Sequence, residues 1–159
     1  MTEFDHHLIL ETKLGSLTIG EKDNAIVCVK WNYSISENPH SENRLLEKAA
    51  REILEYLNGE RQTFNIPTTF IKGTPFQIGV WNALKSIPYG QTVSYGQVAD
   101  ILNKPHAARA VGRANHENPL CLIIPCHRVI GQSGALTGYA GGLHIKQKLL
   151  ELERISLLR

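Results

Sequence analysis

The sequence predicts an α/β (α+β) protein in which a small antiparallel sheet with one helix precedes a helical domain. Three patterns in the 159 residues support this prediction. Short β-branched segments alternate with turn residues over residues 7–31, which favours strands joined by tight turns. Beyond about residue 41, apolar residues recur at helical spacing. The sign of the charge changes within residues 60–73, so we expect a linker there and domains of residues 1–72 and 73–159.

The first domain is expected to hold three strands and one helix. The strand-like runs are Leu8–Leu10, Leu17–Ile19 and Ala25–Trp31. Apolar residues from Leu45 to Leu57 then repeat at helical spacing, with Ser41 as the expected N-cap and Asn58-Gly59 as the stop signal.

No metal site is expected in this domain. Cys28, its single cysteine, falls inside the third predicted strand and is interpreted as a core residue. His6, His7 and His40 lack ligand spacing, so we expect them on the solvated surface.

The second domain begins with a run of short helices. Thr74-Pro75 supplies a cap and a proline at the first helical position. Ser94 caps the next helix, from Tyr95 to about Leu102, and a further helix covers residues 106–116. Two short helices joined by a tight turn predict a helix-turn-helix, although helical hairpins that bind nothing share this pattern.

The second of these helices has one small apolar face and one basic face. The apolar face comprises Ala107, Ala110, Val111 and Ala114, and the basic face comprises Arg109, Arg113 and His116. Residues 72–159 carry a net charge of +6, against −4 for residues 1–71. This asymmetry suggests a polyanionic partner for the second domain, with a chance distribution as the alternative.

A thiol, an imidazole and a guanidinium stand side by side at Cys126, His127 and Arg128. Only about 3% of an ordinary thiol is thiolate at pH 7, and a nearby histidine or positive charge raises that fraction. The apolar run Leu122–Ile124 and Pro125 predict a strand that ends in a loop, where a reactive side chain can be presented. The alternative is a small buried core cysteine, which is how we interpret Cys121.

The C-terminal region combines a flexible loop with a helix. Residues 131–142 contain five glycines, which suggests a loop that passes close to another group, or a mobile surface loop. Residues 143–157 are predicted to be helical. Glu153 falls near the buried side of that helix, where a carboxylate needs a partner such as a histidine; an exposed helix-edge glutamate is the alternative.

Several sequence features bear on the cellular setting. No apolar run is long enough to span a membrane, and the N-terminus lacks the pattern of a signal peptide. The chain has three cysteines and no Cys-x-x-Cys pair, which argues against a disulfide framework and predicts a reducing, cytoplasmic environment.

The segment Pro125–Val129 resembles the signature of the O6-alkylguanine-DNA alkyltransferases, also called methylated-DNA–protein-cysteine methyltransferases. The resemblance covers about residues 74–155 and includes Tyr95, Arg109–Gly112, Asn118-Pro119 and Gly138–Gly142. It implies a ribonuclease H-like first domain and a winged-helix-like second domain that carries the active site. The implied activity is DNA repair by irreversible, stoichiometric transfer of an alkyl group from O6-alkylguanine, and from O4-methylthymine, to Cys126. It further implies a monomer that needs no cofactor.

The resemblance also implies chemical roles. Cys126 would accept the alkyl group, His127 would deprotonate it through a water, and Glu153 would orient the imidazole. Tyr95 would hydrogen-bond the purine and help to protonate the departing guanine. The base must be flipped out of the duplex, at a cost of roughly a few kcal/mol, before the thiol can reach it.

The remaining matched residues would contact DNA or shape the site. Asn118 would hold the turn around the site, and Arg109 would take the place of the flipped nucleotide. The other implied DNA and pocket contacts are Gly96, Lys104, Tyr139 and Ala140. Some relatives have serine in place of Ala140, so any hydroxyl contact there is absent. Some also hold a structural zinc, which this chain is expected to lack.

Two other hypotheses remain at this point. Alkyltransferase-like proteins bind alkylated DNA without repairing it, but they lack the acceptor cysteine that this chain has. A Cys-His thiol hydrolase would require an oxyanion site and repeated turnover, and it leaves the helix-turn-helix unexplained.

Overall fold

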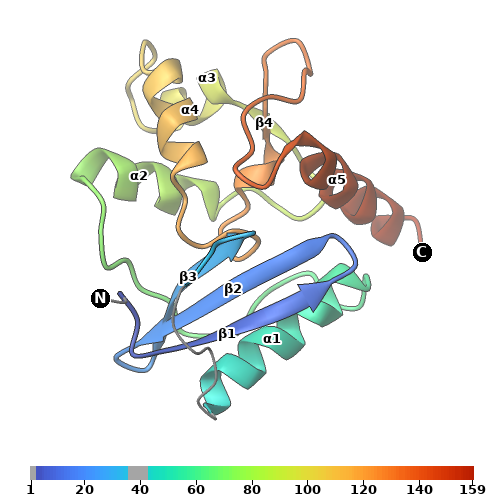
Figure 1. The fold of residues 1–159 in the computed structure, drawn as a ribbon. Coiled ribbons are helices and arrows are strands. Elements are labelled where there is room, and N and C mark those ends of the chain that lie inside the picture. Colours follow the sequence, from blue (N-terminus) through green and yellow to red (C-terminus); the bar gives the residue numbers. More distant parts are fainter. Residues whose placement is uncertain (1–2, 36–42) are drawn as a thin grey trace. The chain divides into compact units, whose positions relative to one another are not determined.

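The computed structural model describes residues 3–35 and 43–159, which form two compact units (Figure 1). The first unit runs to Ile71 and also includes Pro119–Ile123, whereas the second comprises Lys72–Asn118 and Ile124–Arg159. Among the described residues, every helix is too short or too polar to cross a membrane.

The first unit is built on a three-stranded antiparallel sheet in the order β1-β2-β3. The strands are β1 (His6–Thr12), β2 (Gly15–Lys22) and β3 (Ala25–Trp31). Asp23 and Asn24 both have positive φ, as a tight hairpin turn between β2 and β3 requires. The predicted meander is confirmed, and Cys28 is buried within β3, where burial raises the pKa of its thiol to about 12.

The free edge of β3 is covered by two short segments. Ile26 bridges to Thr68, and Val29 bridges to Leu120, both in parallel orientation. Residues 60–73, which the sequence predicted to be irregular, therefore form one bridge to the sheet, through Thr68. Capping the edge in this way removes a row of unpaired backbone groups that would otherwise favour association with other chains.

The helix α1 (Arg44–Leu57) packs on the sheet through the apolar face that its sequence predicted (Figure 1). Its N-cap is Asn43, whose side chain accepts a hydrogen bond from the Leu46 backbone N–H. Ser41, the cap expected from the sequence, lies outside the described residues. The helix ends at Asn58-Gly59 as predicted, with Gly59 at a φ of 77°.

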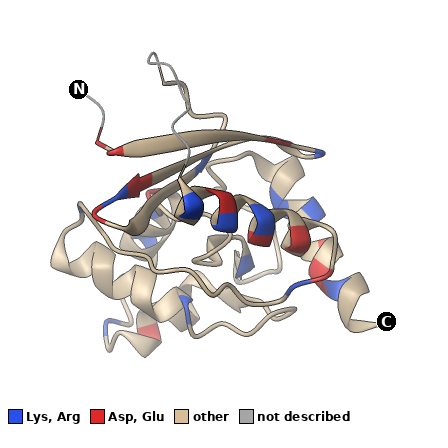
Figure 2. Cartoon of the chain, turned by 90° about the horizontal axis from the view of Figure 1, so that it is seen from below, with Lys and Arg blue, Asp and Glu red and all other residues tan. Residues whose placement is uncertain are grey.

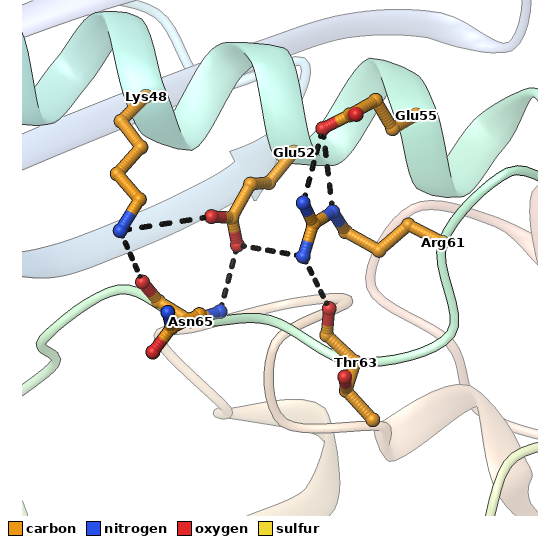
Figure 3. A network of polar contacts seen from close by, with 6 residues as sticks. All are labelled: Lys48, Glu52, Glu55, Arg61, Thr63 and Asn65. Carbon is orange, nitrogen blue, oxygen red and sulfur yellow. Dashed lines mark hydrogen bonds and ion pairs between the residues drawn. The ribbon is translucent and has the colours of Figure 1, made fainter.

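Residues of both charge signs follow one another along α1 (Figure 2), and one carboxylate among them is buried. Glu52 accepts a hydrogen bond of 2.7 Å from the Asn65 backbone N–H, and it lies 3.6 Å from Arg61 and 3.9 Å from Lys48 (Figure 3). Arg61 also pairs with Glu55 at 3.2 Å. The network attaches the segment that follows α1 back onto the helix.

The expectation that His7 is a surface residue is wrong, because its exposed fraction is only 8%. His7 shares its face of β1 with Ile9 and Glu11, which are exposed, so its burial comes from the row in which it pairs with Gly20. A Cβ on Gly20 would lie 2.7 Å from the Phe4 ring, so this ring packs closely over the row that contains Gly20 and His7. His40 lies outside the described residues. In the described part of the chain, no three His, Cys, Asp or Glu residues cluster closely enough to hold a metal ion.

The second unit is mostly helical, as predicted. Its helices are α2 (Pro75–Leu84), α3 (Tyr95–Ile101), α4 (Ala108–His116) and α5 (Leu143–Leu157). Thr74 and Ser94 each form a complete capping box, with Gln77 and Gln97 respectively. A short parallel pair, β4 (Val93–Ser94) and β5 (Val129–Ile130), joins the start of α3 to the segment after Cys126.

The predicted helix-turn-helix is present as α3 and α4, which pack against each other and against α2. The indole N–H of Trp81 on α2 donates a 2.8 Å hydrogen bond to the carbonyl of Ala114 on α4. Val111 and Ala114 are buried, while Arg109, Arg113 and His116 are exposed. The inner and outer faces of α4 are therefore those that its spacing predicted.

The predicted strand before Cys126 is wrong. Leu120 forms a single bridge, Leu122 has a φ of 72°, and the chain turns before it reaches Ile124. Two prolines, Pro119 and Pro125, bound the run and each lacks a backbone N–H, which prevents a regular ladder. The apolar residues are buried as expected, but in a loop.

Candidate active site

Cys126 begins a single 3₁₀ turn, Cys126–Arg128, whose three residues are all buried. Its thiol is not in a disulfide, and its exposed fraction is 2%. Two asparagine side chains hold the backbone here: Asn115 Nδ2 donates to the Cys126 carbonyl at 3.2 Å, and Asn118 Nδ2 donates to the Ile124 carbonyl at 2.9 Å. The turn is fixed on both sides of the cysteine, so the thiol has a defined position.

The carboxylate of Glu153, on the buried face of α5, gathers the residues that follow Cys126. It lies 2.7 Å from His127 Nε2, and it accepts hydrogen bonds from Arg128 Nε at 2.8 Å and Nη2 at 2.9 Å. The Gly90 backbone N–H adds a fourth contact at 3.0 Å. Four donors around one buried carboxylate satisfy its oxygens and fix its orientation.

The imidazole of His127 is held neutral. Burial lowers the pKa of His127, and this effect outweighs Glu153, which acts in the opposite direction. The Arg128 and Lys146 charges lower it further. Because Nε2 faces a carboxylate, Nε2 carries the proton and Nδ1 carries the lone pair. A neutral, oriented imidazole is suited to accept a proton.

A buried cation completes the surroundings of the thiol. Lys146, on α5, has no exposed surface, and its ammonium donates to the carbonyls of Val129 at 2.6 Å and Thr137 at 2.7 Å. Burial lowers its pKa to about 8, while interaction with Cys126 acts to raise it. This coupling means that a positive charge on Lys146 favours a thiolate at Cys126.

The basic face of α4 borders a groove with a volume of about 680 Å³. Its lining comprises Tyr95, Arg109, Gly112, Arg113, His116, Glu117, Thr137 and Gly138. The hydroxyl of Tyr95 donates to the Thr137 carbonyl at 3.0 Å, so the start of α3 is tied to the glycine-rich loop. Two of the predicted substrate-binding residues, Tyr95 and Arg109, therefore share one groove.

The other predicted residues are more scattered. Gly96 is partly buried in the first turn of α3, and Lys104 is exposed after α3, with its ammonium 5.2 Å from the centre of the Phe76 ring. Neither residue lines the groove. Tyr139 is buried and Ala140 is exposed, in a turn closed by the Gly142 N–H bond to the Tyr139 carbonyl.

Two residues that complete this arrangement, Lys146 and Thr137, were given no role by the sequence analysis, and Arg128 was considered only as a positive charge beside Cys126. Arg128 was visible beside Cys126, but its buried contacts with Glu153 and the Ile87 carbonyl were not. Lys146 lies three and seven positions before Leu149 and Glu153, which places all three on one helix face. This spacing could have predicted that Lys146 is buried. No local pattern pointed to Thr137.

The second unit thus brings together a buried thiol, a neutral imidazole, a fixed carboxylate and a cation. Such an arrangement can activate a thiol as a nucleophile, because the imidazole takes its proton and the cation stabilises the resulting charge. The basic groove beside it can hold a polyanion.

Two family models match this chain. One describes the DNA-binding domain of 6-O-methylguanine DNA methyltransferase and matches residues 75–155. The other describes the ribonuclease-like domain of the same family and matches residues 6–70. The predicted fold class, a ribonuclease-like sheet domain followed by a helical DNA-binding domain, is therefore confirmed.

Individual proteins agree with the family models. The constitutive methylated-DNA–protein-cysteine methyltransferase of Bacillus subtilis is 44% identical over 96% of this chain and 97% of its own length. A methylated-DNA–protein-cysteine methyltransferase of Methanosarcina barkeri is 49% identical over 94% of this chain and 97% of its own. The crystal structure of Mycobacterium tuberculosis OGT in complex with DNA has a TM-score of 0.86 at 40% identity, covering 95% of this chain and 94% of that one.

Proposed function

The chain belongs to the O6-methylguanine DNA methyltransferase family, and we propose that Cys126 is the residue that receives the alkyl group, once per molecule and irreversibly. The protein is a methylated-DNA–protein-cysteine methyltransferase that binds DNA and repairs alkyl damage in it. We propose a role in this reaction for each residue of the site.

The observation that carries the proposal is the setting of Cys126. Of the three cysteines, Cys126 is the one followed by a histidine whose Nε2 is fixed by a carboxylate, and it interacts with the buried Lys146 charge. Cys28, by contrast, has a pKa raised to about 12 by burial, so its thiol is unreactive. Cys121 belongs to the other unit.

The proposed reaction is a displacement at carbon. His127 Nδ1 takes the thiol proton, directly or through a water, and the Cys126 sulfur forms a bond to the alkyl carbon. The bond from that carbon to O6 breaks, and its electron pair stays with guanine. Tyr95 donates a proton to the purine, which lowers the cost of the leaving group. Glu153 orients His127 and stabilises the imidazolium that forms.

The proposed substrate is double-stranded DNA that contains O6-alkylguanine, and also O4-methylthymine. The exposed Arg109 and Arg113 on α4 supply positive charge to the groove beside Tyr95. Cys126 is almost fully buried, so it reacts only with a base that leaves the duplex. In this proposal, Arg109 fills the gap that the flipped nucleotide leaves.

The remaining residues have supporting roles in this proposal. We assign Asn118 to holding the loop before Cys126, since its side chain binds the Ile124 carbonyl. Tyr139 and Ala140 lie in the glycine-rich segment assigned to the alkyl pocket, and Gly96 and Lys104 are assigned DNA contacts. Residues 73–159 form the alkyl-acceptor domain and residues 1–72 the supporting domain of a monomer. Three cysteines that form no disulfide suit a reducing, cytoplasmic setting.

A stoichiometry experiment tests the proposal. The product is a thioether, which lacks an activated carbonyl for water to attack, so each molecule is expected to act once. Excess duplex with O6-methylguanine should transfer one methyl group per active chain and then stop, and peptide mass mapping should place it on Cys126. Sustained turnover with unmodified Cys126 would instead indicate hydrolysis, and binding without transfer would indicate a damage-binding protein.

Two variants sharpen this experiment. Cys126→Ser should abolish transfer while leaving binding to alkylated duplex intact, because it removes the acceptor sulfur alone. Cys121→Ser is the matched control and should still transfer. A normal methyl yield from Cys126→Ser would contradict the assignment.

A further inference from the structure

The hydroxyl of Tyr95 exchanges two hydrogen bonds with a single residue, Thr137. The phenol donates to the Thr137 carbonyl at 3.0 Å, and the Thr137 hydroxyl donates to the phenolic oxygen at 3.2 Å. Thr137 lies in the glycine-rich segment between β5 and α5, 42 positions after Tyr95. The orientation of the phenolic proton is therefore set by this one distant residue.

The Tyr95 ring also has close neighbours on two sides. A Cβ on Gly112 would lie 3.7 Å from ring atom Cδ1, and a Cβ on Gly138 would lie 3.7 Å from the phenolic oxygen. Gly112 belongs to α4 and Gly138 to the glycine-rich segment. Backbone from both elements thus approaches the ring, and Thr137 then fixes the direction of its hydroxyl.

The position of Thr137 is itself fixed from inside the unit. Its carbonyl accepts a second hydrogen bond, of 2.7 Å, from the buried ammonium of Lys146. The same ammonium donates to the Val129 carbonyl at 2.6 Å, one residue after the turn that contains Cys126. A chain of contacts therefore runs from the Cys126 turn through Lys146 and Thr137 to the Tyr95 hydroxyl.

We propose that Thr137 is a positioning residue for proton donation by Tyr95, and that it acts through its side-chain hydroxyl. The inference rests on the proposed function, in which Tyr95 gives a proton to the departing purine. Before substrate binds, the phenolic proton points to the Thr137 carbonyl. When that proton turns to the purine, the Thr137 hydroxyl continues to donate to the phenolic oxygen.

This second bond matters most in the transition state. Negative charge develops on the phenolic oxygen as its proton passes to the purine, and a hydrogen bond to a charged oxygen is stronger than one to a neutral oxygen. An interaction that strengthens in this way lowers the barrier rather than improving binding. The expected signature is a slower transfer step with unchanged affinity for DNA.

Thr137→Val tests the inference, because valine keeps the branched shape and removes only the hydroxyl. The single-turnover rate on O6-methylguanine duplex, at saturating protein, should fall about 3- to 10-fold, the effect of one hydrogen bond. The Kd for the same duplex should not change. Thr137→Ser restores the donor and should recover most of the rate. Ser133→Ala, which removes an exposed hydroxyl from the same segment, should react like the parent protein.

A double-mutant cycle separates action through Tyr95 from a general effect on the loop. Tyr95→Phe removes the phenolic oxygen, so adding Thr137→Val to it should cause no further loss of rate. The inference would be overturned if the rate losses of the two single variants multiplied in the double variant. It would also be overturned if Thr137→Val reacted as fast as the parent. The proposed function is judged separately, by the methyl on Cys126 of the parent protein; if that is missing, both fall.

Discussion

Each unit of the protein contains one buried helix glutamate that contacts basic side chains and a backbone N–H, yet only one of the two belongs to the proposed active site. Glu52 on α1 faces Lys48, Arg61 and the Asn65 N–H (Figure 3), and Glu153 on α5 faces His127, Arg128 and the Gly90 N–H. Both carboxylates are almost fully buried. Burial and charge pairing alone therefore do not mark a functional carboxylate.

The difference lies in the partners. The cations around Glu52 reach water, since 39% of the Lys48 side chain and 28% of the Arg61 side chain are exposed. Their closest contacts to Glu52 are 3.9 and 3.6 Å, longer than a good hydrogen bond. Around Glu153 the side-chain partners are themselves buried, with none of the His127 side chain and 8% of the Arg128 side chain exposed, and the contacts are 3.0 Å or shorter. One of these partners, His127, is the neighbour of Cys126 in the sequence.

The comparison shows what turns a structural ion pair into part of a site. In the first unit the carboxylate attaches a segment of backbone to a helix. In the second unit, a similar carboxylate orients the His127 ring next to the proposed nucleophile, so a change at this carboxylate should affect the reaction. Substitutions at the two glutamates should therefore separate stability from activity.

The largest effect is expected for Glu153→Gln. Removing this charge leaves Arg128 buried without a counter-ion, which should lower the free energy of unfolding by about 3–5 kcal/mol. Methyl transfer by the folded fraction should also slow, because the imidazolium of His127 loses its stabilising charge. Urea unfolding and single-turnover transfer measure the two losses. A variant with normal stability and rate would show that the two carboxylates are equivalent after all.

Glu52→Gln is the matched substitution in the other unit and should have a smaller effect. The amide oxygen can still accept from the Asn65 N–H, and Lys48 and Arg61 remain solvated, so we expect a loss of about 1–2 kcal/mol. The transfer rate of the folded protein should equal that of the parent. A slower transfer step in Glu52→Gln, with folding intact, would remove the distinction between the two sites.

The smallest effect concerns pH, because only the Glu153 network includes an imidazole. Burial lowers the pKa of His127 in the folded protein, so the unfolded chain binds the proton first as the pH falls below about 6.5. Protonation therefore favours unfolding, and His127 should contribute a loss of at most about 1 kcal/mol between pH 6.5 and 5.5. The difference in urea midpoints between the parent and His127→Gln across this range measures it. An identical pH dependence in both proteins would show that the imidazole titrates normally.

The elements that could be predicted from the sequence are those governed by local rules. The cap residues Thr74 and Ser94, the proline at position 75 and the turn at Asp23-Asn24 act within a few residues, and each lies where expected. The faces of α4 also followed from spacing alone. The assignment of Cys126 as a candidate nucleophile came from adjacent residues and a family resemblance.

What was missed depends on contacts between distant residues. The apolar run before Cys126 was predicted as a strand because periodicity cannot separate a buried strand from a buried loop. The two prolines that bound the run prevent regular strand pairing, and the hydrogen bond from the Asn118 side chain holds the run as a loop. Lys146 and Thr137 were missed because their partners lie 9 to 42 positions away. His7 was assigned to the surface because its spacing fits no metal site, whereas its pairing with Gly20 beside the Phe4 ring buries it.

The two tryptophans of the chain are divided between the units, with Trp31 at the end of β3 and Trp81 on α2. The indole of Trp81 is buried and bonded to α4, the helix that carries the basic face. The fluorescence emission of Trp81 is therefore an intrinsic probe of the packing of α2 against α4. In a Trp31→Phe background that signal would come from one indole, so the helical unit can be followed by fluorescence as a duplex or an alkyl group is added, without any attached dye.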